Sequence, residues 1–228
     1  MKVTLLALAL ASVSTMSASI IFYAESAGAQ FSHLGGTTVE TFDSLTPGAL
    51  GLYTSSIGNY SPGGAVVGAN IWGGSNNTNY MAVGQQSGGS SYSLTFGGAQ
   101  SFFGFYWLAM DAANLVQFYN GSTLVAAFSS NDVSAILSSA YLGNPNTSTD
   151  LAEKFAFIGF LSDNTATNFT TVTFNSLNSG TGFETDNHTT LAGSGVIPSA
   201  TPEPSTLAMM VPALGALAVA VRRRFLRN

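Results

Sequence analysis

Apolar and polar residues alternate through the middle of the chain, from residue 31 to residue 199, in the short runs that β-strands typically show. Tyr92, Leu94 and Phe96 alternate with Ser93 and Thr95, as expected for a strand with one buried face. Apolar, aromatic and β-branched residues gather in further short runs, which also favour strands. These runs cover residues 39–42, 80–83, 101–108, 155–161, 170–174 and 182–191.

The strongest local pattern is a hairpin over residues 115–128. Asn120-Gly121 lies between two apolar runs, and this pair favours a type I′ turn. Helix signals are sparse, and only residues 132–140 favour a short helix, with Asp132 as its N-cap. The stretch 58–79, rich in Gly, Asn and Ser, is expected to form long surface loops.

Many short strands separated by turn residues, without alternating helices, indicate an all-β fold. We expect one antiparallel β-sandwich over residues 30–197, built as a jelly-roll-like variant. An immunoglobulin-like sandwich is the alternative, and the sequence does not separate the two strongly.

The N-terminal residues 1–29 have the pattern of a signal peptide. Lys2 supplies the positive start, residues 5–13 are apolar, and Ala27-Gly28-Ala29 has small residues at the cleavage positions. We therefore expect export, and a mature chain that begins near Gln30.

The C-terminal residues 198–228 have three parts in a fixed order. A linker leads to Pro202-Glu203-Pro204, an apolar stretch at 206–221 is expected to form a single transmembrane helix, and a cluster of arginines follows at 222–224. Positive charge after an apolar segment favours the cytoplasmic side of a membrane. Proline keeps the first part out of a helix, so we expect it to be extended and open to a protease.

This tail resembles the PEP-CTERM sorting signal. The resemblance implies recognition of Pro202, Glu203 and Pro204 by an exosortase, an integral-membrane cysteine protease of Gram-negative bacteria. It also implies a transient anchor in the inner membrane, followed by release or attachment at the cell surface, often together with exopolysaccharide.

The middle of the chain resembles a family of exosortase-dependent surface proteins. The family usually has Gly-Ser where this chain has Leu108-Ala109, and Phe-Asp where it has Thr185-Asp186. The resemblance implies a location and not an activity. It rests on residues 79–84, 103–107, 116–128 and 182–188.

Charge is scarce, since only 7% of residues are Asp, Glu, Lys or Arg. Lys154 is the only basic residue between the two ends, whereas most of the acids lie there. One cation does not make a phosphate-binding surface, so nucleic-acid binding is not expected. The chain has no Cys, which excludes disulfides and thiolate metal sites.

Catalytic patterns are weak. The only histidines are His33, expected in a loop, and His188, expected at the surface. The sequence has neither a Gly-x-Ser-x-Gly elbow nor a His-Glu-x-x-His motif, and none of the scattered acids stands out as a glycosidase pair. We therefore expect no enzyme activity, with a weak glycan hydrolase as the least favoured interpretation.

A structural calcium ion is a more specific hypothesis than catalysis. Calcium takes six to eight oxygen ligands from carboxylates, amides and backbone carbonyls. Carboxylates occur early, at Glu40 and Asp43, and late, at Asp186 beside Asn187. The arrangement resembles jelly-roll carbohydrate-binding domains, in which the first and last strands often share a calcium site. The alternative is that these acids cap turns and keep the domain soluble.

Three aromatic residues are candidates for stacking on sugar rings. They are Trp72, Tyr106 and Trp107. Trp72 lies in the expected loop region, where it could equally anchor the loop, whereas Trp107 ends a strand-like run, which favours core packing for it. The sequence thus predicts a non-catalytic exported surface or matrix protein that an exosortase cleaves, associated with exopolysaccharide. The alternative is a carbohydrate-binding module with a structural calcium ion.

Overall fold

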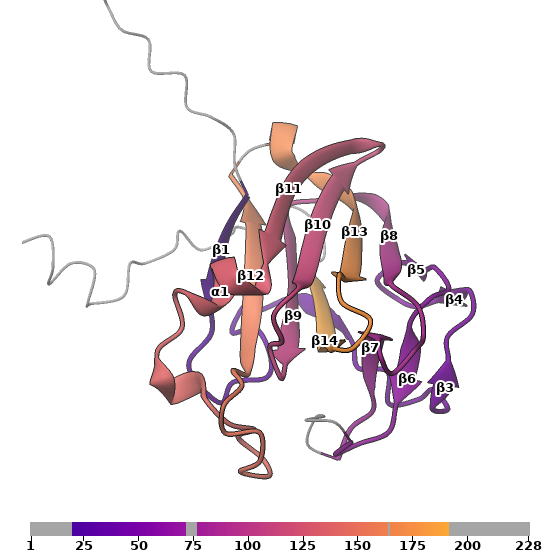
Figure 1. Ribbon diagram of the computed structural model, residues 1–228. Helices are drawn as coiled ribbons and strands as arrows, with labels where there is room; N and C mark the ends of the chain where they lie inside the picture. Colours follow the sequence, from indigo (N-terminus) through magenta and orange to yellow (C-terminus); the bar gives the residue numbers. More distant parts are fainter. Residues whose placement is uncertain (1–19, 72–76, 164, 192–228) are drawn as a thin grey trace, which may run out of the picture. The chain divides into compact units, whose positions relative to one another are not determined.

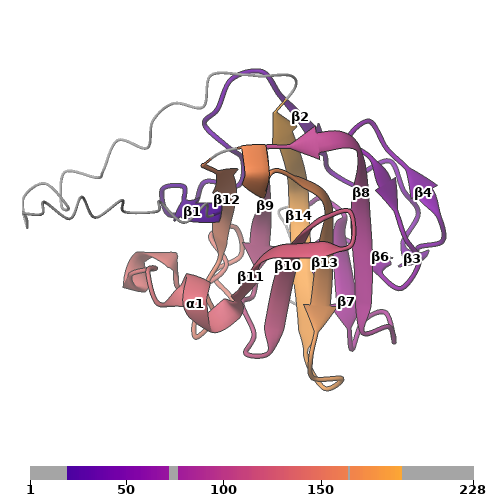
Figure 2. The same cartoon turned by 90° about the horizontal axis from the view of Figure 1, so that it is seen from above.

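Two antiparallel β-sheets pack face to face in the computed structural model, which describes residues 20–71, 77–163 and 165–191 (Figures 1 and 2). All pairings between the named strands are antiparallel. The first sheet has eight strands, in the order β1 (Ile20–Ala24), β12 (Ala156–Ser162), β9 (Phe102–Leu108), β14 (Gly182–Leu191), β7 (Tyr80–Gly84), β6 (Ala65–Val67) and β3 (Gly48–Ala49), with β2 (Thr37–Glu40) paired to β14. The second has six strands, in the order β11 (Thr123–Ser129), β10 (Asn114–Asn120), β13 (Phe169–Ser176), β8 (Ser91–Gln100), β5 (Asn59–Tyr60) and β4 (Tyr53–Thr54).

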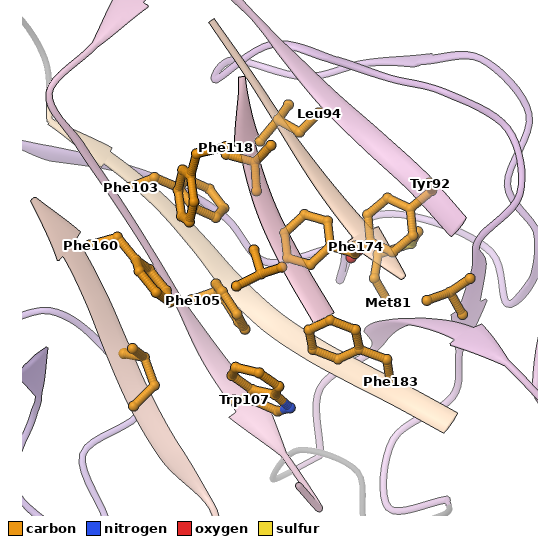
Figure 3. Close-up of a cluster of buried hydrophobic side chains, with 14 of the residues drawn as sticks. Met81, Tyr92, Leu94, Phe103, Phe105, Trp107, Phe118, Phe160, Phe174 and Phe183 are labelled. Carbon is orange, nitrogen blue, oxygen red and sulfur yellow. The ribbon is translucent and has the colours of Figure 1, made fainter. Parts of the chain in front are cut away.

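The main core lies between the two sheets, and 12 of its 24 buried residues are aromatic. Phe174 of β13 crosses from the six-stranded sheet to contact Phe103, Phe105 and Phe183, with ring centroids 5.3–6.1 Å apart. Figure 3 shows these rings gathered with Trp107. Aromatic side chains bury large apolar areas, so they supply most of the hydrophobic stabilisation that holds the sheets together.

The eight-stranded sheet is also covered on its outer face. Every residue of β9 and β12 is buried, and Tyr106, Leu108 and Phe157 belong to a second buried cluster on that face. A strand buried on both sides loses the alternation of apolar and polar residues. This explains why both strands appear in the sequence as continuous apolar runs.

The predicted all-β antiparallel fold is confirmed, and so are the strands at the predicted positions. Helix is limited to α1 (Ser130–Ser134) and two short 3₁₀ turns, η1 (Ser139–Tyr141) and η2 (Thr165–Thr167), within the described residues. The finer assignment to a jelly-roll variant stays a prediction.

Three local predictions need correction. Residues 58–79 are not all loop, since β5 and β6 lie within them. The helix starts earlier than expected, because Ser129 is its N-cap and Asp132 completes a capping box from the third helical position. The hairpin turn is shifted by one residue: Asn120 pairs with Thr123, and only Gly121 between them has a positive φ, so the turn is not type I′.

The described part of the chain includes residues 20–29 of the predicted signal peptide, and cleavage after Ala29 stays a prediction. β1 and the residues up to Ala29 lie inside the folded part, although residues 1–29 were expected to be a signal peptide. The expected linker, the Pro-Glu-Pro stretch and the 206–221 helix lie outside the described residues. Among the residues that the structure describes, no helix has the length and apolar character needed to cross a bilayer.

Candidate functional site

A bulge in β14 decides which of its side chains enter the core. The register of β14 against β9 shifts between Asp186 and Thr189, and Asn187 has a φ of 52°. In a regular strand, residues three apart face opposite sides. Here Thr185 and His188 face the same side, because the bulge inserts one extra residue between them.

The inward side chains form a closed polar network inside the aromatic core. The Tyr60 hydroxyl lies 3.0 Å from Nδ1 of His188, and Nε2 of His188 lies 2.9 Å from Oγ1 of Thr185. Oγ1 of Thr185 in turn lies 2.7 Å from the Tyr92 hydroxyl. If Tyr60 donates to Nδ1 and Nε2–H donates to Thr185, both ring nitrogens are satisfied.

His188 was expected at the surface, and that prediction is wrong. The residue is fully buried, and its ring contacts Phe42 and Phe174 at centroid distances of 5.0 and 4.9 Å. Burial lowers the pKa of His188 to about 3, because the charged ring would be removed from water. The imidazole is therefore neutral at neutral pH and enclosed within the core, which suits a structural role.

The outward side chains of β14 have a different environment. Glu184 is 2% exposed and accepts a hydrogen bond from Nε2 of Gln86, while its Oε2 has no partner among the described residues. Burial, and then the nearby charge of Asp111, raise the pKa of Glu184 to about 8. The pKa values of Asp111 and Glu153 are raised as well, in each case chiefly by burial.

Glu40, Asp186 and Asn187 lie on neighbouring strands and Asp43 follows β2, but oxygens of the three carboxylates already have protein partners. β2 and β14 are adjacent, with Glu40 opposite His188. Glu40 accepts hydrogen bonds from the Tyr53 hydroxyl at 2.9 Å and from the Phe42 amide at 2.8 Å. These bonds fit the alternative role, in which the carboxylate stabilises local chain geometry.

The other candidate ligands are held in the same way. Asp43 accepts the amide of Asn79 at 2.9 Å, Asp186 accepts the Thr78 hydroxyl at 3.2 Å, and the Asn187 side chain donates to a backbone carbonyl at 2.9 Å. In residues 20–71, 77–163 and 165–191 there is no group of three or more His, Asp or Glu that could hold a metal ion.

Two of the three candidate stacking residues are not available to a sugar. Tyr106 and Trp107 are both buried, one on each face of β9. The strand is covered on both faces, so the aromatic rings pack against protein instead of forming an exposed platform. Trp72 lies outside the described residues.

Among the pockets lined by described residues are two at the surface, of about 210 and 360 Å³. Tyr141, Asn144 and Leu151 are among the residues that line the smaller one, and Val66 and Gln86 line the larger. No Asp, Glu or His is found among the described residues lining either pocket. Neither therefore brings together groups suited to acid–base chemistry.

The C-terminal sequence carries a signal for protein sorting. Residues 200–224 carry the PEP-CTERM protein-sorting motif. The motif implies an exported protein of Gram-negative bacteria that an exosortase processes, and the match includes Pro202, Glu203 and Pro204. Neither the curated proteins nor the solved structures include a match to this chain.

Sequence reasoning missed the members of the buried network other than His188. Tyr60, Tyr92 and Thr185 come from three separate strands, and nothing local in the sequence brings them together. The one available signal was Asn187, since Asn tolerates the left-handed conformation that this bulge uses.

Proposed function

We propose that this chain is a non-catalytic cell-surface or extracellular-matrix protein, cleaved by an exosortase and positioned alongside exopolysaccharide. The observation that carries the proposal is the PEP-CTERM motif at residues 200–224, which implies export and processing. The β-sandwich is then the part of the protein that works outside the cell.

The described residues support a non-catalytic role. Both ring nitrogens of His188 have partners in the core network. Nδ1 of His33 lies 2.6 Å from Oε1 of Glu25. Lys154 donates to the carbonyl of Ser134, the last residue of α1, and to that of Leu137, both at 2.7 Å, and so satisfies carbonyls at and beyond the C-terminal end of the helix. Both histidines and Lys154 thus have hydrogen-bond partners within the fold.

The composition also suits a hydrated polysaccharide environment. Neutral hydroxyl and amide side chains form hydrogen bonds with sugars and water, and few charges are present to attract or repel a polymer. The alternative, a carbohydrate-binding module stabilised by calcium, depends for its aromatic platform on Trp72 alone, because Tyr106 and Trp107 are buried.

The proposal is tested by mass spectrometry of the surface form, expressed in a host that contains an exosortase. We expect the parent chain to end near the Pro-Glu-Pro stretch and to lack Arg222–Arg224. Replacing Glu203 with Ala should leave the whole tail attached, because the recognised sequence is broken. Pro198→Ala is the matched control, since Pro198 lies just before the matched residues and its loss should not change processing.

A surface form of the parent chain that retains Arg222–Arg224 would contradict processing by an exosortase. Normal cleavage of the Glu203→Ala variant would contradict the role given to the motif. Release of the processed protein from cells after enzymatic removal of exopolysaccharide is the expected sign of association, and unchanged retention would count against it.

A further inference from the structure

The first strand of the fold is built from residues that a cut after Ala29 would remove. β1 pairs with β12 over five positions, from Ile20 opposite Ser162 to Ala24 opposite Ile158. Figures 1 and 2 both show β1 beside β12 at one edge of the eight-stranded sheet. The strand thus pairs with residues 158–162 of β12.

The side chains of β1 also belong to the core. Ile20 is only 6% exposed, and Phe22 contacts Phe128 and Phe160 at centroid distances of 5.1 and 6.1 Å. Phe128 lies on the edge strand of the other sheet. Phe22 therefore closes the gap between the two sheets at this side of the sandwich.

The partner strand is shaped to receive β1. A Cβ atom at Gly159 of β12 would lie within 3 Å of three atoms of the Tyr23 side chain. A glycine inside a strand often marks such a close approach. Gly159 thus leaves the space that the Tyr23 ring occupies.

The residues after β1 are tied to the fold as well. The Glu25 amide donates to the Phe157 carbonyl at 3.0 Å, and the Glu25 carbonyl accepts the Tyr141 hydroxyl at 2.7 Å. The Gln30 carbonyl accepts the Asn187 side chain at 2.9 Å. The Ala29–Gln30 bond therefore lies between two anchored points of the same structure.

Removal of residues 20–29 would leave β12 as an open edge. Every residue of β12 is buried in the folded protein, and the strand carries no charge. Exposed apolar edge strands promote pairing with other chains and aggregation. An exported domain that lost β1 would expose such an edge.

The sequence offers another cleavage position upstream. The apolar run ends at Val13, and small or hydroxyl-bearing residues follow it. Ser17 and Ser19 would stand at the −3 and −1 positions of a cut before Ile20. A leader of residues 1–19 lies within the usual length of a signal peptide, which is roughly 15–30 residues.

We infer that the leader peptidase hydrolyses the Ser19–Ile20 bond, so that the exported protein keeps β1. Water adds across this amide bond and gives a carboxylate on Ser19 and an amine on Ile20. Ala27-Gly28-Ala29 is then a surface turn of the mature domain and not the processing site. The inference stands on the strand pairing and does not depend on the C-terminal motif.

The direct test is N-terminal sequencing of the exported full-length chain. We expect a start at Ile20, and a start at Gln30 would overturn the inference. A pair of matched variants sharpens the result. Ser17→Gln with Ser19→Gln should cause the precursor to accumulate, whereas Ala27→Gln with Ala29→Gln should leave processing unchanged. Accumulation in the second variant alone would equally overturn the inference.

A second measurement uses the thermal stability of the exported protein. Gly159→Ala should lower its melting temperature by several degrees, because the new Cβ clashes with Tyr23. Most of this loss should disappear when Gly159→Ala is made in a Tyr23→Ala background. Gly104→Ala is the control, since its Cβ would meet Phe157 instead, and its effect should be the same in both backgrounds.

An identical effect of Gly159→Ala with and without Tyr23 would show that the mature protein lacks β1. If the Gly159→Ala variant does not fold, the N-terminal sequence of the parent chain still decides the question.

Discussion

The buried polar groups on the two faces of β14 differ in whether they have hydrogen-bond partners. On the inner face, Thr185 and His188 satisfy each other and two tyrosines within a dry aromatic core. On the outer face, Oε2 of Glu184 has no hydrogen-bond partner among the described residues, and the same is true of the Tyr106 hydroxyl on the neighbouring strand β9. One strand thus carries a completed network and an incomplete one, back to back.

The difference shows how a buried ionisable group is kept neutral in each setting. Burial lowers the pKa of His188 to about 3 and raises that of Glu184 to about 8. Both shifts favour the uncharged form, because neither group has an opposite charge to compensate for lost hydration. Both faces therefore make stability depend on pH, the inner face on the acid side through His188 and the outer face on the alkaline side through Glu184.

Breaking the inner network at His188 should have the largest effect. His188→Ala leaves a cavity among aromatic rings and removes the partner of the Tyr60 hydroxyl. We expect a loss of about 3–5 kcal/mol in the free energy of unfolding, measured by urea denaturation. His33→Ala is the matched control, and because the His33 side chain is 62% exposed its effect should stay within about 0.5 kcal/mol. Similar losses for the two variants would contradict the structural role of His188.

Removing only the bridging hydroxyl tests the network without a change of volume. Thr185→Val leaves Nε2 of His188 and the Tyr92 hydroxyl without their shared partner. We expect a loss of about 2–4 kcal/mol, since each unsatisfied buried group costs about 1–3 kcal/mol. Thr171→Val is the control, because its hydroxyl is exposed and lies 3.4 Å from that of Thr95. A loss below 1 kcal/mol at Thr185 would mean that the network adds little.

The outer face predicts a smaller, pH-dependent effect. The folded state binds the Glu184 proton more tightly than the unfolded state, so this stabilisation is complete below pH 4.5 and is lost as the pH rises through about 8. His188 acts in the opposite direction, because stability is lost as the pH falls from 6.5 towards 3. The two slopes cancel between pH 4.5 and 6.5, where we expect a plateau of maximum stability.

Glu184→Gln should remove the decline above pH 6.5, because an amide does not ionise. At pH 8 the variant should be more stable than the parent by about 1–3 kcal/mol, measured by thermal or urea unfolding across the pH range. Glu153→Gln is the comparison, since Glu153 is less buried and should change the slope less. A parent slope that survives in the Glu184→Gln variant would remove Glu184 as its source.

The strand-forming segments could be predicted from the sequence because their signals are local. The alternation of Tyr92, Leu94 and Phe96 identified β8, and the apolar run at 155–161 identified β12. The hairpin was also found, although its turn was placed one residue early at Asn120. Boundaries of this kind depend on a single backbone conformation, here the positive φ of Gly121, which residue types alone do not determine.

The candidate site was predicted less well, for a physical reason. Period-two reasoning places residue 188 on the face opposite residue 185, and the bulge at Asn187 reverses that assignment. Tyr106 and Trp107 were candidates for stacking on sugars, with core packing favoured for Trp107, and the sequence does not show that both faces of β9 are covered.

By itself, the sequence determined two properties of the protein, its C-terminal sorting signal and its all-β class of fold. The tail at 200–224 is read as a linear signal, and short-range alternation is enough to indicate antiparallel strands. Only the tertiary structure decided which polar groups are buried together and where the folded domain begins. Both depend on contacts between residues far apart in the chain, such as Tyr60 with His188 and Tyr23 with Gly159. The sorting signal in the sequence is therefore confirmed, and the pairing of β1 with β12 adds residues 20–24 to the sandwich that was expected to begin at residue 30.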